Sequence, residues 1–200
     1  DDWFPDHLQS LMALFQEDPG LDVVSGSVET FHEGPDAPPP RIWEITTWHV
    51  EDFPRTLALH NFMQPSATLL RRSAVQSVGG FDTTPAIQHI EDYDLWIRLV
   101  EHGSRFAFLA RPTSRYRRHE GGASYDDQRM RKLHDLLYAK HANFFRTSQS
   151  FLLISMMGRM DRLRKEVIQL NIERNGPVIR VVRALDRAIR ALGRMVRGSK

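Results

Sequence analysis

The stretch of sequence that decides the fold is residues 91–99, Glu91-Asp92-Tyr93-Asp94-Leu95-Trp96-Ile97-Arg98-Leu99. At helical spacing, Asp92 lies on the same face as the apolar residues at positions 95, 96 and 99, whereas Asp94 lies on another face, one turn before Arg98. We therefore expect Asp94 to pair with Arg98 on a solvated face. A carboxylate at the end of a buried apolar stripe costs free energy, so such a residue is usually kept for a function. Asp92 is therefore the candidate catalytic residue. The alternative is that Glu91 and Asp92 only occupy a helix N-terminus, where the macrodipole favours anions.

The patterns on both sides of this segment are typical of alternating helices and strands. In chain order, the expected elements are a helix at 8–15, strands at 21–28 and 67–70, a helix at 72–78, a glycine turn at 79–82, a helix at 91–102, and strands at 106–109 and 113–116. Residues 42–63 have no readable pattern. From about residue 126 the chain is predicted to be helical, with a break at 175–177. The predicted fold class is therefore α/β, a sheet with flanking helices followed by a helical C-terminal extension.

Composition and charge exclude several classes of protein. The chain has no cysteine, which excludes a disulfide framework and thiolate-bound metals and favours a reducing, cytoplasmic setting. No apolar run approaches the roughly 20 residues that span a bilayer. Residues 157–200 carry twelve Lys/Arg and four Asp/Glu, a net charge of +8; since the whole chain carries +2, residues 1–156 carry −6. A nucleic-acid binder is usually basic across its fold, so this balance indicates no nucleic-acid partner.

Two further clusters carry groups suited to phosphate chemistry. Asp1 and Asp2 are adjacent carboxylates, hard oxygen ligands suited to Mg²⁺ or Mn²⁺ bound together with a phosphate-bearing substrate. The segment Tyr116-Arg117-Arg118-His119 places cations and an imidazole at a strand end, and a glycine loop follows it as far as Ser124. Such a loop can close over a diphosphate. The competing interpretation of His119 is an ordinary surface histidine, one of nine in the chain.

Five short motifs, taken in order, resemble the second half of a family 2 glycosyltransferase of the GT-A fold. They are Asp1-Asp2-Trp3-Phe4-Pro5, Gln64-Pro65-Ser66, Gly79-Gly80-Phe81-Asp82, Glu91-Asp92-Tyr93-Asp94-Leu95-Trp96 and Tyr116-Arg117-Arg118-His119. The resemblance covers residues 1–125, which it assigns to the acceptor-side half of a GT-A domain. The residue pattern assigns 126–175 to a helical extension and 176–200 to a basic amphipathic helix. It implies that a nucleotide-binding half precedes Asp1. We therefore expect this chain to be a truncated part of the enzyme, inactive by itself.

The same resemblance implies a reaction and the residues that carry it. The expected reaction transfers a sugar, with inversion, from a nucleotide-sugar donor to a hydroxyl of a glycan or lipid-linked acceptor, as in bacterial polysaccharide biosynthesis. Asp92 is the expected general base and Glu91 its support. The other expected site residues are Asp1, Asp2 and His119 for a divalent metal (Mg or Mn), Arg117, His119 and Ser124 for the donor diphosphate, and Pro65, Ser66 and Trp96 for the acceptor.

The C-terminal segment 177–197 is strongly amphipathic, with arginines roughly opposite an apolar stripe. The stripe steps by four and three through Val178, Val182, Leu185, Ile189, Leu192 and Val196. An Arg-rich face can dock on an anionic membrane surface, which would hold the enzyme on the inner face of the plasma membrane near a lipid-linked acceptor. The same spacing fits a helix that packs on the domain or on a second copy as a short coiled coil, so both interpretations stay open.

Two other classes of function stay open at this point. A metal-dependent hydrolase could use His89, Asp92, Asp94 and His119, but the sequence has no paired-histidine spacing of a zinc site and the glycine turn would have no role. A noncatalytic module that binds a membrane or a partner through the basic helix would leave the acidic cluster without a task. We therefore expect a glycosyltransferase.

Overall fold

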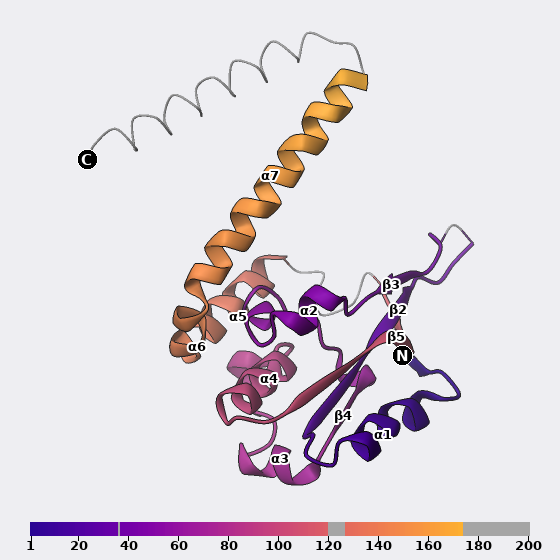
Figure 1. Ribbon diagram of the computed structural model, residues 1–200, viewed down its shortest axis with the longest axis vertical. Helices are drawn as coiled ribbons and strands as arrows, with labels where there is room; N and C mark the ends of the chain where they lie inside the picture. The colour runs from indigo at the N-terminus through magenta and orange to yellow at the C-terminus, as the bar shows by residue number, and fades with distance from the viewer. Residues whose placement is uncertain (36, 120–126, 174–200) are drawn as a thin grey trace. The chain divides into compact units, whose positions relative to one another are not determined.

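The computed structural model describes residues 1–35, 37–119 and 127–173 (Figure 1). The chain divides into two compact units, Asp1–Gln149 and Ser150–Lys200. The first unit contains a five-stranded sheet with helices beside it. This architecture confirms the predicted α/β class, with a sheet flanked by helices.

One parallel pair of long strands forms the centre of the sheet. Strand β2 (Val23–Phe31) runs parallel to β5 (Phe106–Arg117). On the far side of β5, the short strand β1 (Asp2–Trp3) pairs antiparallel with it. Strands β4 (Thr68–Leu70) and β3 (Arg41–Trp43) pair antiparallel with the beginning and the end of β2, respectively. The resulting strand order is β1-β5-β2-β3, with β4 also beside β2.

A single strand, β5, takes the place of the two short strands predicted before and after Pro112. That prediction was wrong because the interruption is absorbed as a bulge. Gly26 of β2 lies opposite Leu109, but the next residue, Ser27, lies opposite Pro112. Proline has no N–H for the ladder, and a bulge is a position where a sheet tolerates it. The Ser27 hydroxyl donates to the carbonyl of Ala110 at 2.5 Å, which binds the bulged segment to β2.

The helices of the described residues are α1 (His7–Glu17), α2 (Thr47–Glu51), α3 (Arg72–Ser77), α4 (Glu91–Glu101), α5 (Asp127–Lys140), α6 (Ala142–Thr147) and α7 (Gln149–Glu173), with 3-10 turns η1 (Arg55–Ala58), η2 (Pro65–Ala67) and η3 (Pro85–Ile87). The structure confirms, to within a few residues, the predicted helices at 8–15, 72–78 and 91–102 and the predicted strands at 21–28 and 67–70. Gly79 and Gly80 form the predicted turn with φ values of +82° and +76°, a region that favours glycine.

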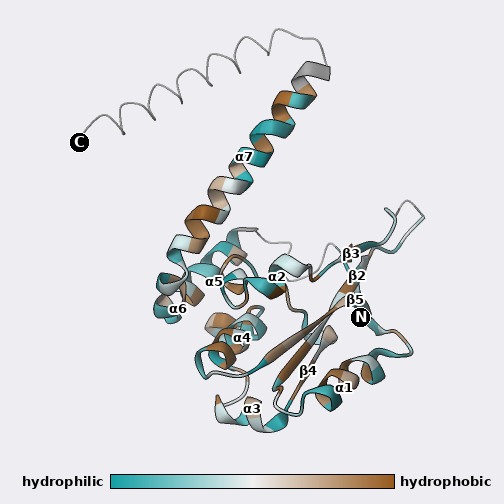
Figure 2. Ribbon diagram, in the orientation of Figure 1, coloured by the Kyte–Doolittle hydropathy of each residue, from teal (hydrophilic) through white to brown (hydrophobic). Residues whose placement is uncertain are grey.

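Apolar side chains cover both faces of the sheet, and Figure 2 shows the apolar character of its central strands. On one face, α1 packs against the sheet through a cluster formed by Leu11, Phe15, Leu21 and Val24. On the other face lies a cluster of aromatic rings from β5 and from the segment after α2, formed by Phe53, Phe62, Phe106 and Phe108. Because successive residues of a strand point to opposite faces, alternate apolar residues of β2 and β5 serve both layers.

The helices α5 and α6 belong to the first unit. Leu133 and Leu137 of α5 and Phe144 of α6 are buried, and the polar His141 between the two helices is 5% exposed. The first unit therefore extends to Gln149, beyond the boundary predicted at residue 125, because these helices bury apolar residues within it.

The second unit is described through α7, as far as residue 173. Apolar side chains recur at spacings of three and four along this helix and are more than half or about half exposed: Leu153, Met156, Met160, Leu163, Val167 and Leu170. Among the described residues, no helix has both the length and the apolar character needed to cross a membrane. The predicted break at 175–177 and the amphipathic segment 177–197 lie outside the described residues, so the membrane and coiled-coil interpretations stay predictions.

Candidate active site

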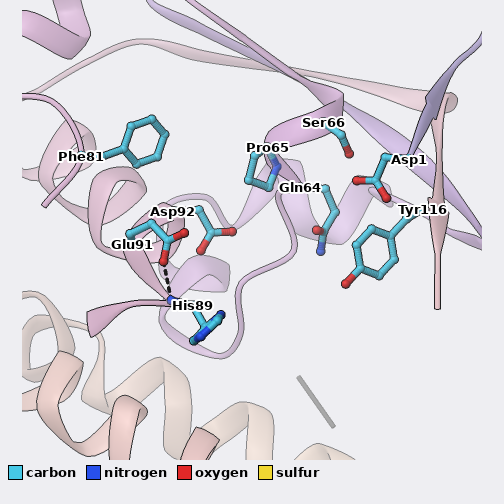
Figure 3. A pocket seen from close by; sticks show the side chains of 9 residues that line it. All are labelled: Asp1, Gln64, Pro65, Ser66, Phe81, His89, Glu91, Asp92 and Tyr116. Atoms are coloured by element: carbon cyan, nitrogen blue, oxygen red, sulfur yellow. Dashed lines mark hydrogen bonds between the residues drawn. The ribbon is translucent and has the colours of Figure 1, made fainter. Parts of the chain in front are cut away.

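A cavity of about 460 Å³ on the first unit gathers residues from all five predicted motifs (Figure 3). The lining residues that were predicted as site residues are Asp1, Pro65, Ser66, Glu91 and Asp92. The other lining residues are Gln64, Phe81, His89 and Tyr116. Segments that are more than a hundred positions apart in the chain therefore meet at one site.

The pairing of β1 with β5 is what carries the chain's first residues to the cavity. Because the two strands are antiparallel, with Asp2 opposite Arg115, Asp1 lies beside Tyr116 (Figure 3). The indole N–H of Trp3 donates to the carbonyl of Ser66 at 2.9 Å, which joins β1 to η2. The first turn of α4 then supplies the acidic pair of the cavity.

Asp92 is a half-buried carboxylate held by two hydrogen bonds. The Asn61 amide donates to Oδ2 at 3.1 Å, and the backbone N–H of Tyr93 donates to Oδ1 at 2.7 Å. Burial raises the pKa of Asp92 from 3.8 to about 6; the two hydrogen bonds oppose this shift, and the nearby charge of Glu91 adds to it. A carboxyl group with a pKa this close to neutrality can take up and release a proton near physiological pH.

Glu91 is held by the backbone beside it. Its Oε2 accepts a hydrogen bond from the backbone N–H of His89 at 2.5 Å. His89 has a φ of +83°, a region that residues other than glycine rarely adopt. Strained backbone of this kind clusters at functional sites. The His89 ring lines the cavity below the acidic pair (Figure 3), although the sequence suggested this residue only as a metal ligand of a hydrolase.

Three predicted ligands of the donor or the metal do not line the cavity. Arg117 follows Tyr116 in β5, so the two side chains lie on opposite faces of the strand. Its guanidinium pairs instead with Glu33 at 3.0 Å. Asp2 and His119 are exposed, and neither is among the lining residues.

Trp96 is a core residue. Its side chain is 0% exposed and is among the largest fully buried side chains of the described residues. An acceptor cannot bind a side chain that has no accessible surface, so the prediction of Trp96 as an acceptor-binding residue was wrong. Ser124, the remaining predicted donor ligand, lies outside the described residues.

Asp94 pairs with Arg98 at 2.8 Å, as predicted, but the predicted solvated face was wrong. The Asp94 side chain is fully buried, and its Oδ1 lies 2.6 Å from Lys140 Nζ and 2.8 Å from His141 Nε2. Burial by itself would raise the pKa of Asp94, but hydrogen bonds from His141, Lys140 and Arg98 outweigh it and hold the pKa well below its usual range. The extra partners are Lys140, the last residue of α5, and His141, the residue after it, so the pattern of α4 alone could not predict them.

The described side chains do not form a complete metal site by themselves. Within residues 1–35, 37–119 and 127–173, no group of three or more His, Cys, Asp or Glu is placed to hold an ion. A hydrolase built on His89, Asp92, Asp94 and His119 therefore lacks its ligand set, since Asp94 is held in buried ion pairs and His119 does not line the cavity. Asp1 does face the cavity (Figure 3).

The sequence interpretation missed several residues at the site. Gln64, Phe81 and Tyr116 belong to the quoted motifs, so their position next to predicted site residues was an available signal. No such signal pointed to Asn61, because it lies in the patternless stretch 42–63, 31 positions before Asp92, the carboxylate to which it donates.

The comparisons with known proteins agree with this geometry. The family model described as "Glycosyl transferase family group 2" matches residues 4–160, which is more than half of the chain. No curated protein matches the chain. The matched region contains η2, the glycine turn, the acidic pair of α4 and the end of β5, which all contribute residues to the cavity wall; Asp1, which also lines the cavity, lies before the matched region. The chain therefore belongs to glycosyl transferase family group 2.

Proposed function

We propose that this chain carries the acceptor side of an inverting glycosyl transfer in which Asp92 is the general base. Membership of a glycosyltransferase family supports transfer of a sugar from a nucleotide-sugar donor to an acceptor. The observation that carries the assignment of the base is the environment of Asp92. It is a cavity-lining carboxylate, held by Asn61 and Tyr93, with its pKa raised by burial to about 6.

In the proposed reaction, an acceptor hydroxyl oxygen attacks the anomeric carbon of the donor sugar. A carbon–oxygen bond to the acceptor forms as the bond to the diphosphate oxygen breaks. The nucleoside diphosphate leaves with the bonding electrons, and the hydroxyl proton passes to Asp92. Attack opposite the leaving group inverts the anomeric configuration. A base within hydrogen-bond reach contributes roughly 10²–10⁴-fold to the rate of such a step.

Glu91 is proposed to support the base. Its charge raises the pKa of Asp92, which makes that carboxylate a better proton acceptor once it is ionised. Its own carboxylate is held by the backbone N–H of His89, so the pair keeps one geometry as the acceptor binds. Pro65 and Ser66, on the cavity wall, are the proposed acceptor contacts.

A divalent metal, Mg²⁺ or Mn²⁺, is proposed to bind at Asp1 together with the donor diphosphate. Asp1 fits this role because it is a carboxylate on the cavity wall, and Mg²⁺ is commonly held by one or two carboxylates plus substrate phosphates. When bound, such an ion supplies positive charge beside the leaving diphosphate. Asp2 and His119 are not carried into the proposal because neither lines the cavity.

The substitution Asp92→Asn in the complete gene product tests the assignment. Turnover is measured as release of nucleoside diphosphate from a panel of UDP-, GDP- and dTDP-sugars, with an extract of lipid-linked glycans as acceptor. We expect turnover to fall by at least about 10²-fold, while calorimetry shows unchanged donor affinity. Asp135→Asn, at an exposed carboxylate on α5, is the matched control and should keep full turnover. Full turnover by Asp92→Asn would remove Asp92 as the base.

A further inference from the structure

The turn at residues 78–82 forms part of the cavity wall and needs anchoring. Phe81, in the middle of the turn, lines the cavity and is 45% exposed. The two residues before it, Gly79 and Gly80, both have positive φ, and glycine has more backbone freedom than any other residue. The backbone N–H groups of both glycines donate to carbonyls of α3, at Gln76 and Val75, so the turn is tied to the helix before it and its far end needs a separate anchor.

Two cations hold the two ends of this turn. The Arg98 guanidinium of α4 donates to the carbonyl of Val78 at 2.6 Å, before the glycines. The Lys140 ammonium of α5 lies 2.6 Å from Oδ2 of Asp82, after them. The turn is therefore fastened to α4 at one end and to α5 at the other.

Both cations are also bound to one buried carboxylate. Asp94 Oδ2 lies 2.8 Å from Arg98 Nε, and its Oδ1 lies 2.6 Å from Lys140 Nζ. The Asp94 side chain is 0% exposed, whereas that of Lys140 is 35% exposed. Charge-assisted hydrogen bonds with a desolvated partner are directional and strong, so Asp94 fixes where both cations point.

We propose that Lys140 is a positioning residue: by joining Asp82 to Asp94, it holds Phe81 in the cavity wall at a set place relative to Asp92. That this placement serves acceptor binding rests on the function proposed above. Lys140 lies outside every motif quoted from the sequence, at the end of a helix that starts after them.

The competing explanation is that Lys140 only neutralises the buried Asp94. Asp94 keeps two other partners, Arg98 and His141, when Lys140 is removed. Asp82, in contrast, keeps only local hydrogen bonds within the described contacts, from the backbone N–H and the side chain of Thr84, two residues further along the same segment. Loss of Lys140 therefore releases the turn more than it exposes the buried charge, and Lys140→Met should still fold.

Mobility of the turn is the direct test, and the chain suits it because it contains no cysteine. Phe81→Cys provides a single attachment site for a nitroxide spin label, whose nanosecond motion is read by electron paramagnetic resonance. Adding Lys140→Met should shorten the rotational correlation time of the label at least about twofold, and Lys140→Arg should restore it. Lys132→Met, at an exposed lysine of the same helix, should leave the spectrum unchanged.

Asp82→Asn provides a second route to the same break, from the exposed end of the link. It should mobilise the label as much as Lys140→Met does, and the two changes together should add nothing further, since they remove one link. An unchanged spectrum in Lys140→Met beside a lowered melting temperature would overturn the proposal in favour of simple neutralisation. Additive effects of the two substitutions would also overturn it.

Turnover in the complete gene product separates this proposal from the proposed function. With the lipid-linked glycan extract as acceptor, Lys140→Met should raise the KM for the extract roughly tenfold, the size of effect expected from one lost charge-assisted hydrogen bond, and should change kcat less than KM. A fall in kcat with KM unchanged would overturn the positioning role. If instead Asp92→Asn keeps full turnover while the label responds as expected, the proposed base fails and the anchoring of the turn stands.

Discussion

Replacing Asp92 by asparagine should stabilise the protein at neutral pH while removing its activity. The folded protein carries Asp92 in a half-buried place that raises its pKa from 3.8 to about 6. Below pH 3.8 the carboxyl is protonated in both the folded and the unfolded chain. As the pH rises from 3.8 to about 6, the unfolded chain releases this proton before the folded chain does, so the wild-type protein loses stability over that window and stays at the lower level above it. Asparagine has no proton to release and avoids the loss.

The size of the gain follows from the pKa shift. The difference between a pKa of 3.8 in the unfolded chain and a pKa of about 6 in the folded protein corresponds to a free energy of about 3 kcal/mol. Two effects reduce this gain in stability. Solvent in the open cavity screens the charge of Asp92. In the variant, the new amide group also faces the Asn61 amide that donates to Oδ2 in the wild type, and the loss of that hydrogen bond costs about 1 kcal/mol. A net gain of about 2 kcal/mol above pH 6 is expected, or roughly 4–8 °C in melting temperature for a chain of this size.

Urea unfolding of the wild type and of Asp92→Asn at several pH values between 4 and 8 measures this difference. The gain should be small near pH 4, grow up to about pH 6 and then level off. The exposed Asp135→Asn is the matched control and should show no such growth. A gain that does not depend on pH, or a loss of stability above pH 6, would refute the assignment of Asp92 as a carboxylate held at energetic cost.

Three further outcomes are expected. Asn61→Ala removes a hydrogen bond that lowers the pKa of Asp92, so the acid limb of the pH profile of kcat/KM should move to higher pH. An acid limb at the same pH in the variant would contradict the link between the two residues. Treatment with EDTA should stop sugar transfer, and added Mg²⁺ or Mn²⁺ should restore it. The Asp1→Asn variant should need a higher metal concentration for the same turnover. Turnover that does not change with EDTA would remove the metal from the proposal. Trp96→Ala should lower the free energy of unfolding by about 3–5 kcal/mol in urea titrations; a loss well below 1 kcal/mol would be incompatible with a fully buried indole.

Local patterns predicted the elements that local interactions build. The spacing of α4 predicted its length and the pairing of Asp94 with Arg98, one turn apart on the same helix. The paired glycines at 79 and 80 predicted a turn that only residues without a side chain adopt easily. The family resemblance predicted that residues from separate motifs share one site, and Asp1, Ser66 and Asp92 do line one cavity.

What the sequence alone could not decide was the surroundings of each side chain. Trp96 beside an acidic pair resembled a binding residue, but packing on both sides of α4 put it in the core. Pro112 suggested the end of a strand, but pairing with β2 turned the interruption into a bulge.

The sequence by itself therefore determined the class of fold, the position of Glu91 and Asp92 in the first turn of a helix, and the set of motifs that contribute residues to the cavity. Tertiary structure alone decided that Asp92 is held by Asn61 and that Asp94 is buried under Lys140 and His141, partners 31 to 47 positions away along the chain. The physical reason is that backbone periodicity depends on neighbours within a few residues, whereas desolvation and the partners of a charge depend on which distant segments pack against it.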